Sequence, residues 1–363
     1  MGRQWLGEIG DGTTVPRFGA PVAVAGGRVF TQVTAGYDHG CGLLSSGIAY
    51  CWGNNLEGEL GDSTTATRYV PTAVAGGRLF TQIASGSEYT CGLARTRRAY
   101  CWGANYIGQL GNNSSGRRAN WLVPTAVAGE LIFTRIVPGD DHTCGLTGAG
   151  RAYCWGRNTE GELGDGTKTD RLVPTAVAGG RTFALITAGY DHTCGLTSAG
   201  IGYCWGRNTH GEIGDSTTIG RVTPTAVAGG RIFTQIAGGG AHTCGLTSSG
   251  HAYCWGFNYD GRVGDSTQNN IRLAPTPVAG RLTFTQIVTG SDQTCGLTKA
   301  GAAYCWGSIA DDQLGDGGKP RATRATRLVP TAIAGGLRFR SLSAGKFHTV
   351  GLLGPLDHGA ATT

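Results

Sequence analysis

The residues with the clearest chemical potential in this chain are twelve cysteines, which recur as pairs. In each pair the first cysteine begins Cys-Gly-Leu and the second lies within Tyr-Cys-Trp-Gly. The pairs are Cys41 and Cys51, Cys91 and Cys101, Cys144 and Cys154, Cys194 and Cys204, Cys244 and Cys254, and Cys295 and Cys305. Cysteines in such a pattern could form disulfides, bind zinc, or remain buried free thiols.

The elements that must position these cysteines are copies of one unit. The paired motif returns about every fifty residues along nearly the whole chain, and no linker or change of composition interrupts it. A fixed period in this range indicates a solenoid, a propeller or an array of small units. We therefore expect residues 1–363 to form one domain with six complete repeats.

The fourth unit shows the local structure that we expect in each repeat. Residues 181–189, 192–197 and 201–205 are predicted to form three strands. Ser198-Ala199-Gly200 joins the second and third strands, and its glycine suits the left-handed position of a bulged hairpin. The segment 207–228 is predicted to contain a loop and a fourth, outer strand. Four antiparallel strands in about fifty residues are typical of a propeller blade.

This hairpin pairing predicts a disulfide within each unit. It sets Cys194 opposite Cys204 at a separation that a disulfide tolerates, and Tyr203 opposite Gly195, which leaves room for the tyrosine ring to pack on the next unit. The last, incomplete repeat has Val350 at the first cysteine position and lacks the Tyr-Cys-Trp-Gly strand, so both members of that pair are missing together. Zinc is less favoured, because structural zinc prefers ligands two to four residues apart. Disulfides would place the mature protein in an oxidising compartment, secreted or extracellular.

Two fragments at the chain ends complement each other. The first eleven residues match the segment that normally follows a third strand, and residues 338–352 match the first and second strands. We expect a seventh blade built from about residues 1–20 and 336–363, which closes the ring by joining the two termini. Its third strand is unaccounted for: either residues 357–363 supply it, or the chain was cut from a longer precursor that also carried a secretion signal.

The repeats resemble the regulator of chromosome condensation family. The residues that carry the resemblance are Gly189-Tyr190-Asp191-His192-Thr193-Cys194-Gly195-Leu196, Tyr203-Cys204-Trp205-Gly206-Arg207-Asn208, and Gly108-Gln109-Leu110-Gly111. The resemblance implies an all-β fold, a seven-bladed β-propeller with four-stranded antiparallel blades. It also implies action by binding macromolecules, as in the chromatin-bound exchange factor, the plant photoreceptor and the secreted bacterial proteins of this family. The cysteines and the lack of a basic tail make the chain most similar to the secreted bacterial members.

The positions that vary between repeats are the candidates for partner binding. Two residues between the glycine and the histidine of Gly-x-x-His differ in every unit, and equivalent loops of a propeller share one face. Acidic residues and tyrosines concentrate there, and they suit contact with a protein partner, although aspartate also favours turns for its own reasons. The candidate site residues are Tyr37, Asp38, Glu88, Tyr89, Asp140, Asp141, Tyr190, Asp191 and Asp292.

Other charged residues recur without pointing to catalysis. The histidines at equivalent sites favour packing roles, and one aspartate in each Gly-Asp turn is too few for calcium. Arginines in the long loops could form a basic zone; they are Arg68, Arg117, Arg118, Arg171, Arg221, Arg272, Arg321, Arg324 and Arg327. The net charge is only +6, and no stretch has the length and apolar character to span a bilayer.

The sequence thus predicts a monomeric, non-catalytic scaffold that binds a protein through the loops bearing Gly-x-x-His. No cofactor or metal ion is expected. The alternatives are a carbohydrate-binding propeller with several similar sites, and a hydrolase with a site in the central channel. A nucleic-acid partner is not favoured, because no recognised binding module with clustered basic and aromatic residues is present.

Overall fold

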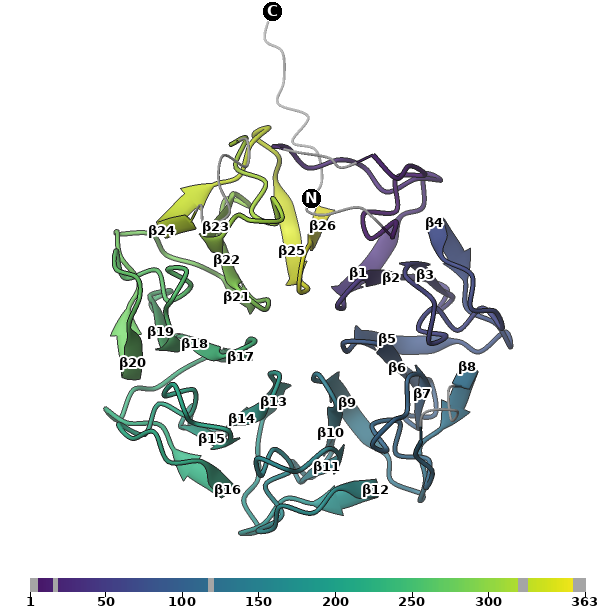
Figure 1. Cartoon of the computed structure of the whole chain (residues 1–363), viewed down its shortest axis with the longest axis horizontal. Helices are drawn as coiled ribbons and strands as arrows, with labels where there is room; N and C mark the ends of the chain where they lie inside the picture. Colours follow the sequence, from purple (N-terminus) through teal and green to yellow (C-terminus); the bar gives the residue numbers. More distant parts are fainter. Residues whose placement is uncertain (1–5, 16–18, 117–120, 319–325, 355–363) are drawn as a thin grey trace, which may run out of the picture.

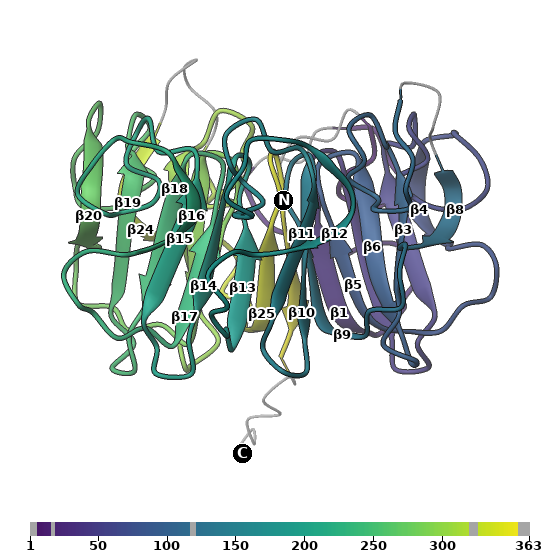
Figure 2. The ribbon, with the colours of Figure 1, turned by 90° about the horizontal axis from the view of Figure 1, so that it is seen from below.

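The computed structural model describes residues 6–15, 19–116, 121–318 and 326–354. All its regular elements are strands, which form six four-stranded sheets and one two-stranded sheet among these residues. Figure 1 shows the sheets arranged around a common central axis, and Figure 2 shows their strand ends and turns gathered on two opposite faces. No described segment is a helix with the length and apolar character needed to cross a membrane.

The first three sheets follow the chain order. The first comprises β1 (Phe30–Ala35), β2 (His39–Leu44), β3 (Ala49–Gly53) and β4 (Arg68–Ala73). The second comprises β5 (Phe80–Ser85), β6 (Tyr89–Ala94), β7 (Ala99–Gly103) and β8 (Trp121–Ala126). The third comprises β9 (Phe133–Pro138), β10 (His142–Thr147), β11 (Ala152–Gly156) and β12 (Arg171–Ala176).

The remaining sheets repeat this pattern. The fourth comprises β13 (Leu185–Ala188), β14 (His192–Leu196), β15 (Gly202–Gly206) and β16 (Arg221–Ala226). The fifth comprises β17 (Gln235–Gly238), β18 (His242–Leu246), β19 (Ala252–Phe257) and β20 (Ile271–Pro277). The sixth comprises β21 (Gln286–Thr289), β22 (Gln293–Leu297), β23 (Ala303–Ser308) and β24 (Thr326–Ala332). The last sheet comprises β25 (Phe339–Ala344) and β26 (Thr349–Leu353).

The prediction of an all-β propeller with four-stranded antiparallel blades is confirmed, with six such blades. The two-stranded sheet lies between the sixth sheet and the first (Figure 1). Its hydrogen bonds to the first sheet include those from Arg340 to the carbonyl of Phe30 at 2.6 Å and from the Ala35 N–H to Ser343 at 3.1 Å. Residues 357–363, which were expected to supply a further strand, lie outside the described residues.

The disulfides follow the predicted hairpin register. Cys194 pairs directly with Cys204 across β14 and β15, and Gly195 pairs with Tyr203. All six predicted pairs are bonded, each with a Cα–Cα distance of 4.1 Å. The hairpin glycine Gly200 has the expected positive φ of 76°. Because the pairing depends only on hairpin register, the sequence sufficed to predict it.

Two expectations about the fourth unit are wrong. The first strand begins at Leu185 instead of residue 181, because the preceding residues bend around the hairpin of the third blade, where the Phe183 N–H bonds to the Gly150 carbonyl at 2.7 Å. The space above Gly195 is taken by the Phe183 ring, whose atoms would lie 2.5 Å from an added Cβ. Tyr203 therefore packs on the cluster that the third and fourth blades share, and not on the next unit.

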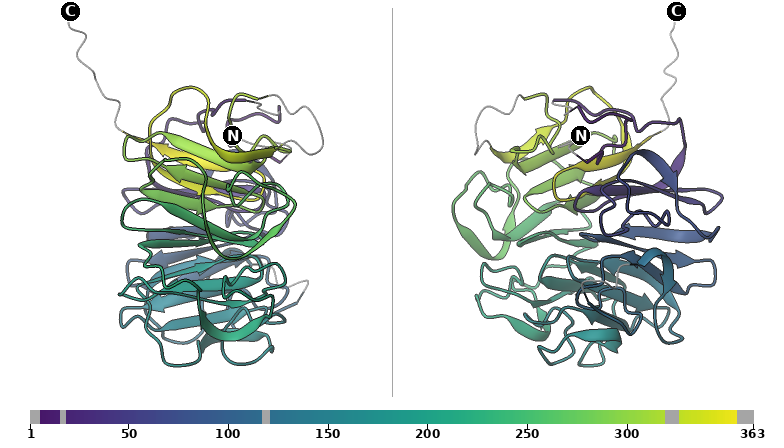
Figure 3. Two further views of the ribbon diagram at one scale, coloured as in Figure 1. Left: turned by 90° about the vertical axis from the view of Figure 1, so that its left-hand side faces the viewer. Right: turned by 45° about the vertical axis from the view of Figure 1, so that its right-hand side comes forward.

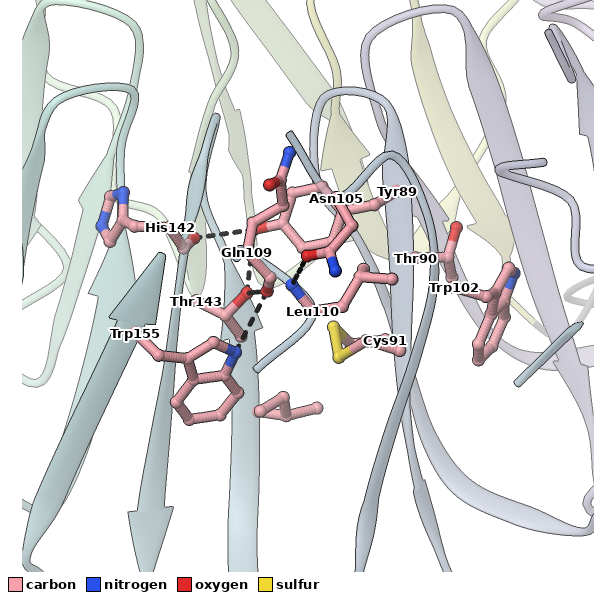
Figure 4. The surroundings of a disulfide bond; sticks show 12 residues. Tyr89, Thr90, Cys91, Trp102, Asn105, Gln109, Leu110, His142, Thr143 and Trp155 are labelled. Atoms are coloured by element: carbon pink, nitrogen blue, oxygen red, sulfur yellow. Dashed lines mark hydrogen bonds between the residues drawn. A yellow bond between two sulfur atoms is a disulfide. The ribbon is translucent and has the colours of Figure 1, made fainter. Parts of the chain in front are cut away.

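Neighbouring blades are joined by one backbone carbonyl in each long loop. The Gln109 carbonyl accepts a hydrogen bond from the Trp155 indole at 3.0 Å and one from the Thr143 hydroxyl at 2.7 Å (Figure 4). At four other junctions between blades, the equivalent threonine hydroxyl and tryptophan indole donate to the same backbone carbonyl. These acceptors are the carbonyls of Glu59, Glu162, Glu212 and Arg262. Sheets linked in this way pack face to face around the axis (Figure 3).

A glycine beside this carbonyl lets the tryptophan approach. At Gly164 and its counterparts, φ is positive and an added Cβ would lie within 2.6 Å of the next blade's indole. The N-terminal segment repeats the contact. The Glu8 carbonyl accepts the Trp52 indole N–H at 3.0 Å, and Gly10 meets the same ring. Residues 7–10 therefore dock on the first blade as a long loop docks on the next blade elsewhere.

Serine substitution at Gly10 tests this docking. Gly10 and Gly12 both have positive φ, but a Cβ at Gly10 would lie 2.6 Å from the Trp52 ring, whereas one at Gly12 would meet only Val70 at 3.5 Å. Serine already occupies the position of Gly12 in other repeats, as Ser63 and Ser216 do with positive φ. We expect Gly10→Ser to lower the free energy of unfolding by about 1–3 kcal/mol more than Gly12→Ser, measured by urea denaturation. Equal losses would contradict the docking.

Candidate functional site

The seven turns that contain the Gly-x-x-His motif, or its variants, lie at the same ends of the sheets, and we call this surface the Gly-x-x-His face. Each turn closes through a backbone bond, for example from the Gly189 N–H to the His192 carbonyl at 2.8 Å. The carbonyl of the second variable residue, such as Asp191, accepts the N–H of Arg207 in the following long loop at 2.8 Å. The N–H and carbonyl groups of these turns are thus used in hydrogen bonds within the fold. The variable side chains form the surface.

The histidines of the motif hold blades together. His142 and His192 lie within 2.9 Å of a threonine hydroxyl in the next blade, Thr193 and Thr243 respectively. Burial lowers the pKa of His142 to about 4, so its ring is neutral near pH 7. The structural role expected from their repetition is therefore the one observed, and these rings are not placed for acid–base chemistry.

Tyr89 differs from the sequence-based expectation. It occupies the histidine position of the second blade and is fully buried, with its hydroxyl donating to the His142 carbonyl at 2.7 Å and lying 3.0 Å from the Thr143 hydroxyl (Figure 4). A longer side chain here makes the contact with the next blade that histidine makes elsewhere. Tyr89 leaves no surface for a partner, so its assignment to the binding site was wrong.

Acidic side chains gather on the first three blades of this face. We call the set formed by Asp38, Glu57, Glu88, Asp140 and Asp141 the acidic sector. Burial, and then repulsion from neighbouring acids, raise the pKa values of Glu88, Asp140 and Asp141. Burial, then the charges of Glu57 and Asp140, raise the pKa of Glu88. Burial and the neighbouring Asp140 raise the pKa of Asp141 to about 6.

Polar neighbours bond to the acidic sector, and the nearby cations Lys346 and Arg157 offset the raised pKa values of Asp140 and Asp141 only in part. Ser87 donates to Asp140, and Gln109 donates to Asp141 at 3.4 Å. Glu88 is exposed. Negative charge therefore accumulates around blades one to three, which is the condition that attracts a positively charged partner.

The acids of the later blades are instead paired with arginine. Asp191 lies 2.9 Å from Arg157 and 3.1 Å from Arg207, so two guanidinium groups flank one carboxylate. Asp292 lies 2.8 Å from Arg262. On these later blades the negative charge of the acids is balanced by arginine. The sequence analysis had treated all the acids of the face alike.

The other two tyrosines of the predicted site, Tyr37 and Tyr190, lie at the mouth of the central channel. Tyr37 packs edge-on against Phe347, with ring centres 5.2 Å apart, and the Lys346 ammonium contacts its hydroxyl and lies 3.6 Å from its ring centre. Tyr190 is partly buried there. Tyr37 therefore helps to join the last sheet to the first, in addition to facing the channel.

Sequence reasoning missed an outer row of apolar side chains on the same face. It comes from the long loops, where Leu56 is 64% exposed and Tyr259 is 40% exposed. Tyr259 stacks on Phe257 with ring centres 5.9 Å apart, and His210 lies against Phe257 at 4.6 Å. The signal that could have found them was the variability of the position after the loop asparagine, which was interpreted only as loop sequence.

The expected basic zone of the long loops is largely neutralised. Arg171 bonds to Asp165 of its own Gly-Asp turn at 2.7 Å, and Asp165 also accepts from the Thr167 hydroxyl at 2.7 Å. The same pairing engages Arg68, Arg221, Arg272 and Arg327. Arg117, Arg118, Arg321 and Arg324 lie outside the described residues. The described part of the chain has no group of three or more His, Cys, Asp or Glu side chains placed to hold a metal ion.

The central channel has a volume of about 510 Å³ and is lined by the first strand of every sheet. Gln32 closes one gap between strands by donating to the Ile83 carbonyl at 2.8 Å and accepting from its N–H at 3.1 Å, and Gln82, Gln235 and Gln286 repeat this. Arg135 and Lys346 are the cationic residues of the described lining, which includes no histidine, cysteine, aspartate or glutamate. The described lining therefore offers no histidine or carboxylate as a general base.

The family model of the RCC1-like domain matches residues 1–284. The chain belongs to the RCC1-like domain family. Among solved structures, this RCC1-like chain is similar to human WBSCR16, with a TM-score of 0.86, 18% identity, and coverage of 97% of this chain and 98% of that one. It is also similar to Prp20p from Saccharomyces cerevisiae, with a TM-score of 0.83, 20% identity, and coverage of 96% and 89%.

A plant structure adds an extracellular example. The CRINKLY WD40 ectodomain of the Arabidopsis thaliana receptor kinase ACR4 matches with a TM-score of 0.55 and 22% identity, over 87% of this chain and 86% of that one. At these identities the likenesses show the shared fold, and the function of this RCC1-like chain has to be argued from its own surface.

Beneath the Gly-x-x-His face, the buried carboxyl of Glu59 predicts a pH-dependent stability. Burial raises the pKa of Glu59 from 4.5 to about 8, so the folded state holds a proton that the unfolded state releases. This contribution to stability is complete below about pH 4.5 and is lost as the pH rises through about 8. Glutamine stands at the equivalent position in the second blade, as Gln109, so Glu59→Gln is compatible with the fold.

We expect Glu59→Gln to flatten the fall in unfolding free energy between pH 5 and pH 8.5 in urea titrations. The gain at pH 8.5 should be at least about 1 kcal/mol, since one pKa unit corresponds to about 1.4 kcal/mol. Exposed Glu130→Gln is the control and should keep the wild-type slope. An unchanged slope in Glu59→Gln would contradict the buried, protonated carboxyl.

Proposed function

We propose that this RCC1-like propeller is a non-catalytic scaffold that binds a protein partner through the Gly-x-x-His face. The observation that carries the proposal is the acidic sector, where Glu88, Asp140 and Asp141 concentrate negative charge on three adjacent blades. Tyr37, Asp38, Tyr190, Asp191 and Asp292 complete the proposed contact surface, and Leu56 and Tyr259 extend it outward. Charge steers the encounter, and aromatic and aliphatic side chains supply the buried contact area.

Related propellers support action by binding. Prp20p was crystallised together with a study of its binding to Gsp1p and histones, and a second structure shows Kap60 bound to it. Only the mode of action, contact with other proteins, is carried over to this chain. The identity of those partners is not.

The differences between blades favour one protein partner over repeated sugar sites. The fourth turn carries Tyr190 and Asp191, whereas the fifth carries Gly240 and Ala241. A lectin-like propeller would need similar pockets in several blades. The described lining of the channel has no histidine or carboxylate to serve a hydrolase as acid or base, so a protein partner is favoured over both the sugar sites and the hydrolase.

We further propose that the chain acts as a monomeric ring of seven blades. The N-terminal segment docks on Trp52 as long loops dock elsewhere, and the last sheet bonds to the first. The Gly19 carbonyl also accepts the Gly317 N–H at 2.6 Å, which links the N-terminal segment to the sixth blade's long loop. The comparison of Gly10→Ser with Gly12→Ser tests this closure.

Charge removal tests the proposed face. The partner would be recovered by affinity capture from the extracellular fluid of the native source, and its dissociation constant measured by calorimetry. We expect the triple change Glu88→Gln, Asp140→Asn and Asp141→Asn to weaken binding at least about tenfold, since central contacts each contribute more than about 1 kcal/mol.

The matched control for this triple change is Glu130→Gln, on the opposite face, which should bind as the wild type does. Normal binding by the triple variant, or weakened binding by Glu130→Gln, would show that the Gly-x-x-His face is not the partner site.

We propose a secreted or extracellular location, because the six disulfides need an oxidising environment to form. Protein isolated from its native source without reductant should show no reactive thiols in a colorimetric titration under denaturing conditions. After reduction, all twelve should react. Twelve reactive thiols before reduction would contradict this location.

A further inference from the structure

The face opposite the Gly-x-x-His face carries an excess of positive charge. We call it the hairpin face, because it holds the turns between the second and third strands and the residues just before each first strand. Its exposed cations are Arg28, Arg78, Arg95, Arg97, Arg98, Arg151, Arg181, Arg231, Arg281, Lys299 and Arg338. Among the described residues Glu130 is its one acid, 3.5 Å from Arg98. The other described acids precede β1 or lie in Gly-x-x-His turns and long loops, toward the opposite face.

Contacts between blades bring these cations into one band. The Phe80 N–H bonds to the carbonyl of Gly47, in the hairpin of the preceding blade, at 2.8 Å. Ile201 pairs with Ile232 of the next blade, and the Arg95 guanidinium reaches the Ser46 carbonyl at 3.1 Å. Each hairpin therefore touches the segment that leads into the next blade, so the cations follow one another around the rim.

Four of these arginines are held by tyrosines. Their guanidinium carbons lie 3.6 to 4.4 Å from the ring centres, in the pairs Arg28 and Tyr50, Arg78 and Tyr100, Arg181 and Tyr203, and Arg231 and Tyr253. No carboxylate of the described chain lies within salt-bridge distance of these four guanidinium groups. A stacked guanidinium keeps its in-plane N–H donors free for an anionic oxygen, and stacking reduces the entropy lost when it binds.

Large aliphatic side chains are exposed between the cations. They are Val29, Ile48, Leu79, Ile132, Ile201 and Ile232, and Val29 is 80% exposed. A surface that combines arginines with protruding aliphatic residues suits an anionic bilayer, where the cations meet headgroups and the aliphatic groups enter the interface. Single-stranded nucleic acid would need open aromatic rings for base stacking, and the four tyrosines are covered by arginine.

We propose that the hairpin face docks on the surface of an anionic lipid membrane. This leaves the Gly-x-x-His face directed away from the membrane, so the proposal does not depend on the partner proposed for that face. Eleven exposed cations against one acid supply the attraction, and it should weaken as salt screens it.

One arginine of this face stands where the backbone favours glycine. Arg97 has φ of 62° at the hairpin position that Gly47, Gly150, Gly200 and Gly250 occupy with positive φ in other blades. A residue other than glycine at positive φ lowers the stability of the fold. Arg97→Gly therefore removes one positive charge and also removes the backbone strain at this position. The substitution therefore tests the surface without damaging the fold.

The experiment measures sedimentation of the full chain with vesicles of phosphatidylcholine containing about 30 mol% phosphatidylserine, against phosphatidylcholine alone. We expect binding only to the anionic vesicles. Arg97→Gly should lower the partition coefficient about fivefold, the effect expected for one basic residue near such a surface. Lys168→Gln, an exposed cation in a long loop of the opposite side, should leave it unchanged.

A second variant separates a membrane from a soluble polyanion. Val29→Ser with Ile232→Ser should weaken vesicle binding further, because the aliphatic groups no longer enter the interface. Absence of binding that depends on phosphatidylserine at low salt would overturn the proposal. Equal losses in Arg97→Gly and Lys168→Gln would also overturn it, as would tighter binding to a DNA duplex that the serine variant leaves unchanged.

Discussion

One hydrogen-bonded backbone carbonyl in each long loop is the constraint on which the rest of this propeller depends. The carbonyl of Glu162 binds the indole of Trp205 at 2.9 Å and the hydroxyl of Thr193 at 2.8 Å, and the same hydroxyl lies 2.8 Å from His142 of the preceding blade. Three side chains from two neighbouring blades thus converge on one buried point. Because the acceptor is backbone, the side chain at this position can change from glutamate to glutamine or arginine without losing the joint.

This arrangement separates the positions that build the fold from those that face solvent. Inside, the disulfide, the tryptophan and the threonine repeat in every complete blade, apart from Gly40 in the first, and each turn uses its backbone for closure. Outside, the two middle residues of each Gly-x-x-His turn are free to differ. Acids collect on the first three blades of the Gly-x-x-His face, the acids of the later blades there are paired with arginine, and the hairpin face carries exposed cations with one described acid, so the two faces differ in charge.

The junction between the last and first sheets departs from the pattern for a local reason. Gly40 stands where the other blades have threonine, so His348 has no hydroxyl to meet, and both its ring nitrogens are buried without a hydrogen-bond partner among the described residues. The last sheet also has Val350 where a disulfide cysteine would be. Arg340, Ser343 and Lys346 make the contacts there instead.

The sequence by itself determined the repeat, the four-stranded blade, the six disulfides and the left-handed hairpin glycine. The disulfides join cysteines only ten residues apart, where hairpin register leaves little choice, and the repeat and the blade follow from the period of about fifty residues itself. Only the tertiary structure decided that Tyr89 is buried, that Phe183 covers Gly195, and which acids are paired with arginine. Each of those outcomes depends on the spacing and tilt of neighbouring strands or blades. It also depends on which long side chains from neighbouring strands or blades contact one another. A single repeat does not encode that geometry, because it arises from packing between sheets.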